Sequence, residues 1–195
     1  MFSIKVKGED RIVHALIQNI ADIPGGVTID VSELVPGSIL KEGTVIGGID
    51  NAGVAHVIKS AAVAVEAAAN ATTIIIEKGS NLKVGDFVSD GKAAVAIAAI
   101  DTTSSNIYDT ITITPNDADG LSKLVKGAVL TQAKSASKTA AAVKYTPVAM
   151  VAENYDVKAG ENLWTAAVVM GTFKKSLVPP VSEDVLAQLK GIILL

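Results

Sequence analysis

The side chains that can act as nucleophiles, general acids or metal ligands are few and scattered in this chain. Cysteine is absent, which excludes disulfides, thiolate zinc sites and cysteine nucleophiles. The two histidines, His14 and His56, each lie in an apolar run and have no second ligand at helical spacing. We therefore interpret both as structural histidines.

One acidic segment is similar to the opening of a calcium loop. Asn116-Asp117-Ala118-Asp119-Gly120 places carboxylates two residues apart before a glycine. The twelfth position falls on Gly127 or Ala128, depending on the start, where a calcium loop needs a bidentate carboxylate. We interpret the segment as a polar turn, and we expect the protein to need no metal and no cofactor.

The turn Val84-Gly85-Asp86 also occurs in self-splicing domains, whose chemistry needs a nucleophile at the domain start and a catalytic histidine. The surrounding region opens at Asn70 and contains no histidine, so we interpret the segment as a turn in which Gly85 supplies the backbone angle and Asp86 bonds its own backbone. No Gly-x-Ser-x-Gly elbow and no phosphate-binding glycine loop are present. The carboxylate pairs Glu9-Asp10 and Glu183-Asp184 lie beside turn or helix-start signals. We expect no catalytic residues and no enzyme activity.

Charge and hydropathy exclude further classes of protein. The 195 residues carry a net charge of −3, and 49% of them are apolar, the opposite of a disordered chain. A single arginine and no basic run longer than Lys174-Lys175 argue against nucleic-acid binding. The longest near-apolar run, Ala61 to Ala69, is far shorter than a membrane span, and no secretory signal opens the chain. We expect synthesis in the cytoplasm and no membrane anchor.

Most of the elements that must position these side chains are expected to be strands. Val and Ile supply 44 residues against 13 Leu, a balance that favours sheet. The segments 11–17 and 60–70 remain open, the first between strand and helical turns, the second between a helix and an extended connector. Residues 131–142 suit a linker or surface loop. At the end of the chain, Ser182 predicts a helix start, Gly191 its end, and 192–195 a last strand. The remaining predicted strands are 4–7, 27–31, short pieces within 36–47, 54–58, 72–76, 87–88, 93–100, 108–114, 145–152 and 163–172.

The spacing of these strands predicts a divided chain. Five or six strands follow one another at short, regular spacing after residue 70, which indicates a small barrel or sandwich. The segments before and after this region share short strands and glycine turns. The predicted fold class is mainly β (α+β): a base domain made of 1–69 and 140–195, with a C-terminal helix and strand, and an inserted β-module and linker at 70–139.

Several short motifs give the chain a resemblance to a known family. Val35 to Ile46 is similar to a Gly-x-Ile/Leu-x-x-Gly-Thr-x-Ile motif, and Asn51-Ala52-Gly53 follows it as a polar-glycine hairpin. Pro147 to Val157, Trp164 to Thr172 and Leu177-Val178-Pro179-Pro180 extend the likeness to about two thirds of the chain. On these motifs the chain resembles the head fibre and capsid decoration proteins of tailed bacteriophages.

This resemblance implies a structural virion protein on the outer surface of a phage capsid, with the major capsid protein as its partner and no active site. A mean hydropathy of +0.43 without a membrane segment predicts a homo-oligomer. A trimer is favoured because capsids present threefold axes. The alternative is a non-enzymatic β-rich module that binds a receptor or carbohydrate. Aromatic residues are scarce for such a module, with Trp164 and three tyrosines, Tyr108, Tyr145 and Tyr155.

Overall fold

The computed structural model describes residues 14–114 and 120–195. Strands take up about 42% of the chain, and the one helix in the described part has four residues, so the protein is mainly β, as predicted. The predicted strand at 4–7 and the carboxylates Glu9, Asp10, Asp117 and Asp119 lie outside the described residues. No described helix has the length and apolar character needed to cross a membrane.

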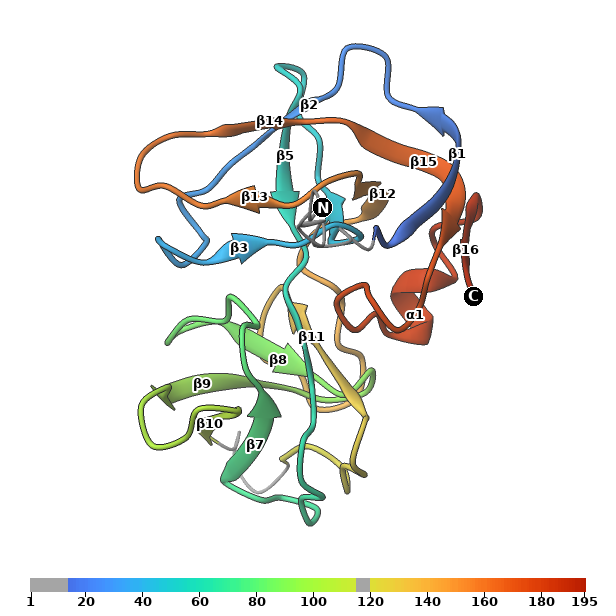
Figure 1. Cartoon of the computed structure of the whole chain (residues 1–195). Coiled ribbons are helices and arrows are strands. Elements are labelled where there is room, and N and C mark those ends of the chain that lie inside the picture. The colour runs from blue at the N-terminus through green and yellow to red at the C-terminus, as the bar shows by residue number, and fades with distance from the viewer. Residues whose placement is uncertain (1–13, 115–119) are drawn as a thin grey trace, which may run out of the picture.

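The strands form two large sheets, one above the other in Figure 1. The eight-stranded sheet has the order β1-β15-β12-β4-β5-β2-β14, with β16 pairing along the same strand β15. Two of its pairings, β2 with β5 and β15 with β16, are parallel. Its strands are β1 (Leu16–Asp22), β2 (Val27–Ile29), β4 (Val45–Gly47), β5 (Val54–Val57), β12 (Pro147–Val151), β14 (Leu163–Thr165), β15 (Ala167–Phe173) and β16 (Ile192–Leu194).

The six-stranded sheet is antiparallel throughout and has the order β6-β11-β8-β9-β10-β7. It curls, because Ile76 in β7 bridges to Val63, immediately after β6 at the other edge. A small two-stranded sheet, β13 (Tyr155–Asp156) with β3 (Ile39–Leu40), accompanies the eight-stranded one. The six strands are β6 (Ser60–Ala62), β7 (Thr73–Glu77), β8 (Phe87–Ser89), β9 (Ala94–Asp101), β10 (Tyr108–Thr114) and β11 (Val129–Ala133).

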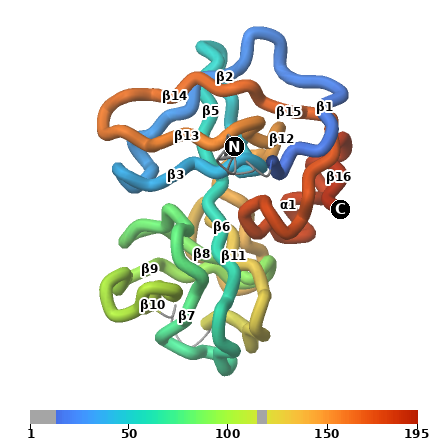
Figure 2. The backbone as a smooth tube through the Cα atoms, in the orientation of Figure 1, coloured from blue at the N-terminus to red at the C-terminus, as the bar shows by residue number. Residues whose placement is uncertain are grey.

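The hydrophobic cores are divided in the same way as the two large sheets. One cluster of buried side chains is built from residues between Ala61 and Leu130 and lies inside the six-stranded sheet. Two others, around Ile29 and Phe173, combine residues from both ends of the chain. The chain passes between the sheets at residues 58–60 and again at 133–147, and Figure 2 traces both passages. These passages bring polar groups to the junction of the two sheets.

Several local predictions are confirmed. Asn51-Ala52-Gly53 closes a turn between β4 and β5, where Gly53 adopts a φ of 76° and its N–H donates to the Asp50 carbonyl. Ser89-Asp90-Gly91-Lys92 joins β8 and β9. Strand β10 buries alternate residues, among them Ile111 and Ile113, as its strict alternation predicts.

The segment 60–70, left open between a helix and an extended connector, is extended: β6 is followed by the bridging residues Val63 and Ala67. The predicted linker beginning at Thr131 is wrong at its start, since Thr131 to Ala133 form the buried end of β11. Its polar residues Thr131 and Gln132 suggested a loop, but β11 pairs with β6 on one side and with β8 on the other, which buries them.

The C-terminal helix is shorter than predicted. Helix α1 (Glu183–Leu186) begins after Ser182, but Ser182 makes no side-chain cap, and the helix ends before Gly191. Gly191 is instead a close-approach glycine, because a Cβ there would lie 2.4 Å from the Val169 carbonyl oxygen of β15. The chain therefore leaves the helix early to reach its pairing position as β16.

Candidate functional site at the junction of the two sheets

The two histidines lie apart. His14 is largely exposed, with Nδ1 3.6 Å from the Glu42 carboxylate, which itself accepts hydrogen bonds from the Ala15 and Leu16 backbone. His56 stacks on Tyr145, with ring centroids 4.4 Å apart, and its Nδ1 is 3.7 Å from Asp30. Within residues 14–114 and 120–195 there is no group of three or more His, Cys, Asp or Glu that could hold a metal ion.

The turn at Val84-Gly85-Asp86 has the predicted local geometry and also more distant partners. Gly85 has a φ of 91°, and Asp86 Oδ2 accepts a hydrogen bond of 2.8 Å from the Lys83 N–H. The same oxygen lies 2.7 Å from Lys59 Nζ, and the other carboxylate oxygen accepts from Gln132 Nε2 at 3.0 Å. The turn thus anchors a polar network as well as its own backbone.

This network joins the two sheets. Lys59 lies in the first passage between them, on the segment between β5 and β6, and its side chain is 1% exposed. Burial lowers the pKa of Lys59, and the hydrogen bond and charge of Asp86 only partly offset that effect. The Gln132 N–H donates to the Lys59 carbonyl, and the Gln132 carbonyl accepts from the Lys144 N–H of the second passage. Lys59 and Lys144 are therefore both tied to Gln132.

A second polar cluster lies on the eight-stranded side of the junction. Glu33 Oε1 accepts hydrogen bonds from Lys144 Nζ at 2.8 Å and from the Tyr145 hydroxyl at 2.7 Å. Burial alone would raise the pKa of Glu33, but these two hydrogen bonds and the lysine charge outweigh it, so the pKa is lowered. Burial raises the pKa of Tyr145, and its bond to Glu33 adds to the rise. In this cluster the ionised Glu33 carboxylate faces the Lys144 ammonium.

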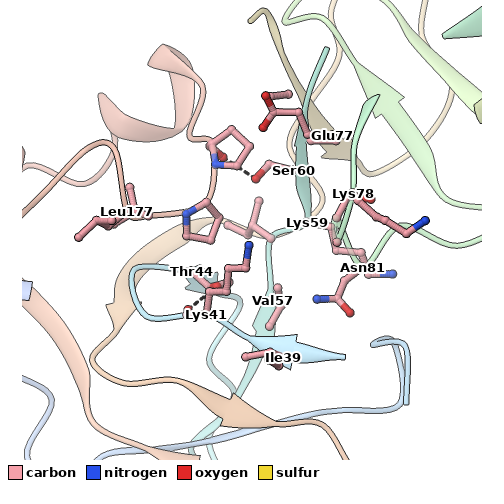
Figure 3. Close-up of a pocket in the computed structure, with 18 of the residues that line it drawn as sticks. Ile39, Lys41, Thr44, Val57, Lys59, Ser60, Glu77, Lys78, Asn81 and Leu177 are labelled. Atoms are coloured by element: carbon pink, nitrogen blue, oxygen red, sulfur yellow. Dashed lines mark hydrogen bonds between the residues drawn. The ribbon is translucent and has the colours of Figure 1, made fainter. Parts of the chain in front are cut away.

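A pocket of about 230 Å³ opens beside this junction (Figure 3). Lysines line it at three positions, Lys41, Lys59 and Lys78. Lys59 forms an ion pair with Asp86. Lys78 lies 3.4 Å from the Asp109 carboxylate, and its Nζ donates to the carbonyls of Thr102 and Ser105. Lys41 makes no ion pair with a described residue. Two of the three ammonium groups are thus engaged by the protein's own acceptors.

The arrangement is suited to holding the two sheets together. Each buried charge faces a partner and further hydrogen bonds, the condition under which a buried ion pair is tolerated. Ser60, one of the hydroxyl residues that line the pocket, donates its hydrogen bond to the Pro180 carbonyl.

Sequence reasoning identified the Gly85-Asp86 turn but missed Lys59, Gln132, Glu33 and Lys144. Glu33 and Lys144 are 111 residues apart, and Asp86 is 27 and 46 residues from its two side-chain partners. One signal was available: Lys59 interrupts an apolar stretch, Val57 to Ala64, where a lysine must either reach solvent or find a carboxylate.

Comparisons with known proteins add no assignment: no protein-family model, no curated protein and no solved structure matches the chain. The functional argument therefore depends on the residues and on the geometry described above.

Proposed function

We propose that this protein is a structural virion protein, a head fibre or decoration protein bound to the outer surface of a phage capsid. The resemblance of Val35 to Ile46, Pro147 to Val157 and Trp164 to Thr172 to that family motivates the proposal. Its partners are the major capsid protein and further copies of this chain, with a trimer favoured.

The observation that carries the proposal is the exposed apolar edge of the eight-stranded sheet. In β1, six of seven residues are exposed, and the pairing with β15 skips Ile17 and Ile20, which are 57% and 56% exposed. Bulges of this kind re-aim side chains at sheet edges. The adjacent strand β15 adds exposed Met170, and β16, on the other side of β15, adds exposed Ile193. We call these four residues the β1 edge, and they are the face proposed for assembly.

We also propose that 1–69 and 140–195 form a base that assembles and binds the capsid, with 70–139 as an inserted β-module and linker. All eight strands of one sheet lie before residue 58 or after residue 146, and all six of the other lie between 60 and 133, which supports this division. The bridge from β7 to Val63 supports a small barrel for the module. The pairing of β6 with β11 favours a first junction near residue 59.

A second candidate function, binding of a receptor or carbohydrate, is favoured by Trp164. Its side chain is 62% exposed and lies over Gly26, with Nε1 donating to the Gly25 carbonyl at 2.9 Å. The indole is thereby fixed and accessible. Of the three tyrosines that could extend an aromatic platform, Tyr145 stacks on His56.

The proposal is tested first by the mass of the protein in solution. Sedimentation velocity at micromolar concentration should give an oligomer, and Ile20→Lys should shift it toward monomer. Val84→Lys, at a site 62% exposed on a turn of the six-stranded sheet, is the matched control and should leave the oligomer intact. A single 19.9 kDa species for the unchanged protein would refute assembly. Immunogold labelling of intact virions then tests the capsid location, and its absence would refute the virion assignment.

A further inference from the structure

The pocket beside the junction of the two sheets combines apolar side chains with nitrogen donors (Figure 3). Its apolar lining includes Ile39 and Leu177, which are 52% and 37% exposed and can therefore be reached by a ligand. Lys41, which follows β3, and Asn81, which follows β7, bring the donors from the two sides of the junction. Junctions between folding units are common places for small-molecule sites.

Lys41 supplies an ammonium group that the protein itself does not engage. Its backbone carbonyl accepts from the Thr44 N–H and hydroxyl, which fixes the turn that carries the side chain. The side chain is exposed and extends into the pocket in Figure 3, and its Nζ makes no hydrogen bond or ion pair with a described residue. The other two lining lysines are held by Asp86 and Asp109.

Asn81 supplies a second donor whose direction is fixed. Its Oδ1 accepts from the Val35 N–H at 3.3 Å and from the Ser38 hydroxyl at 2.7 Å. A backbone N–H needs an acceptor, so the amide cannot be turned around and Nδ2 points away from these two groups. Figure 3 shows the side-chain nitrogen turned toward Val57 and Lys41, and no described residue accepts from it. Two kinds of N–H donor thus enter one pocket without a protein acceptor.

The lining contains one carboxylate, that of Glu77, which is exposed. In Figure 3 it lies beyond Ser60, away from the Lys41 and Asn81 nitrogens, and it makes no ion pair with a described residue. A ligand with one negative charge can face Lys41 at a distance from Glu77. A second negative charge on the ligand would be repelled by the Glu77 carboxylate. The charges of the pocket therefore favour a monoanion.

We propose that this pocket binds a small aliphatic monocarboxylate. The carboxylate accepts from Lys41 Nζ and Asn81 Nδ2, a charge-assisted pair of hydrogen bonds, and the hydrocarbon part lies against Ile39 and Leu177. The pocket volume of about 230 Å³ is below the about 300–1,000 Å³ of drug-sized sites, which limits the ligand to a few carbon atoms.

The proposal goes beyond the capsid function and does not depend on it. The residues of the β1 edge, Ile17, Ile20, Met170 and Ile193, are not among those that line this pocket. A failure of capsid binding would leave the carboxylate site untouched, and a failure of carboxylate binding would leave the assembly proposal untouched.

Binding is measured by ¹H–¹⁵N NMR titration of the full chain with sodium acetate, propionate and butyrate, each up to about 100 mM. Butyrate should shift the Asn81 side-chain amide and the Lys41 and Ser80 backbone amides in a saturable way. Affinity should rise about two- to fourfold with each added methylene, because each one buries apolar surface. The absence of saturable shifts, or the same shifts with sodium chloride at equal concentration, would overturn the proposal.

Two ligands related to butyrate test the charges of the pocket. Succinate has the same number of carbon atoms and a second carboxylate, and it should bind about fivefold more weakly than butyrate because that group approaches Glu77. Butylammonium reverses the charge of the ligand and should not bind. Binding of butylammonium more tightly than butyrate would show that Glu77, and not Lys41, determines the ligand, which would overturn the proposal.

Two substitutions test the donors. Lys41→Gln should weaken butyrate binding about tenfold. Lys126→Gln, at an exposed lysine outside the pocket lining, is the matched control and should change it less than twofold. Unchanged affinity in Lys41→Gln would overturn the proposal.

Asn81→Asp keeps the acceptor for Val35 and Ser38, and aspartate tolerates the φ of 58° at this position. It replaces the donor with a negative charge, so it should abolish the saturable shifts while the remaining spectrum stays dispersed. Butyrate shifts that persist in a folded Asn81→Asp protein would overturn the proposal as well. Should this variant lose its dispersion, the exposed Lys41→Gln substitution still decides the question.

Discussion

The two sheets differ in how far apart in the sequence their strands lie. The six-stranded sheet uses one continuous stretch and curls until its edges meet. The eight-stranded sheet pairs Leu16 with Phe173 and Ile29 with Leu163, and it leaves β1 exposed at its edge. Local pairing lets the six-stranded sheet bring its two edges together, whereas the sheet assembled from distant segments leaves the edge strand β1 exposed.

Removal of the six-stranded sheet is the most drastic way to test this comparison. Both passages hydrogen-bond to Gln132, through contacts of 2.8 and 3.1 Å, so their backbones lie within about 10 Å of each other. A four-residue Gly-Ser linker spans that gap, at about 3.3 Å per residue. Replacing residues 59–143 with it should leave a protein that unfolds cooperatively and still assembles, with a melting temperature lowered by roughly 10 °C.

Circular dichroism melting and sedimentation velocity measure this outcome. Replacement of residues 72–133 alone is the comparison variant. This variant should be less soluble, because β6 would remain while its pairing partner β11 is removed. If the protein in which residues 59–143 are replaced shows no cooperative unfolding transition, the two sheets fold only together.

Elements that depend on neighbours in the sequence could be predicted from it, and contacts between distant segments could not. The alternation of Thr and Ile in 108–114 and the Gly91 turn identify β10 and the β8–β9 hairpin, because each is decided by neighbours in sequence. The pairing of Lys59 with Asp86 is evident only in the folded chain, where β11 also brings Gln132 into contact with both residues.

The second prediction concerns the ion pair that joins the sheets. Lys59→Met should lower the free energy of unfolding by about 3 kcal/mol, because the largely buried Asp86 carboxylate loses its compensating charge. Chemical denaturation in urea measures the change. Lys123→Met removes an exposed partner of Glu66 and should cost less than about 1 kcal/mol. Equal effects of the two substitutions would show that the junction contributes no more than a surface ion pair.

The third prediction concerns the β1 edge. Gly171→Ala should destabilise the eight-stranded sheet by about 2 kcal/mol, because its Cβ would lie 2.6 Å from the Gln18 carbonyl oxygen and push β1 away from β15. Amide hydrogen exchange should quicken in β1 and β15 and stay unchanged in β9 and β10. Gly79→Ala serves as a control, since no atom lies within 4 Å of its Cβ position and only its φ of 89° is unfavourable. Uniform quickening across both sheets would argue against separate behaviour of the edge.

The smallest effect is expected from protonation of Glu33. Its pKa is lower in the folded protein than the 4.5 of the free side chain, so the unfolded state binds the proton more readily. The stabilisation is therefore present above about pH 4.5 and is lost as the pH falls through the lower folded pKa. Glu33→Gln should cost about 1 kcal/mol at pH 7 and progressively less as the pH falls below 4.5, because the unchanged protein then loses the same charge. Glu161→Gln, which alters an exposed pair with Lys158, should follow the unchanged protein at every pH. A constant difference between Glu33→Gln and the unchanged protein from pH 7 to pH 3 would show that the hydrogen-bond geometry at Tyr145, and not the charge facing Lys144, is what Glu33 contributes.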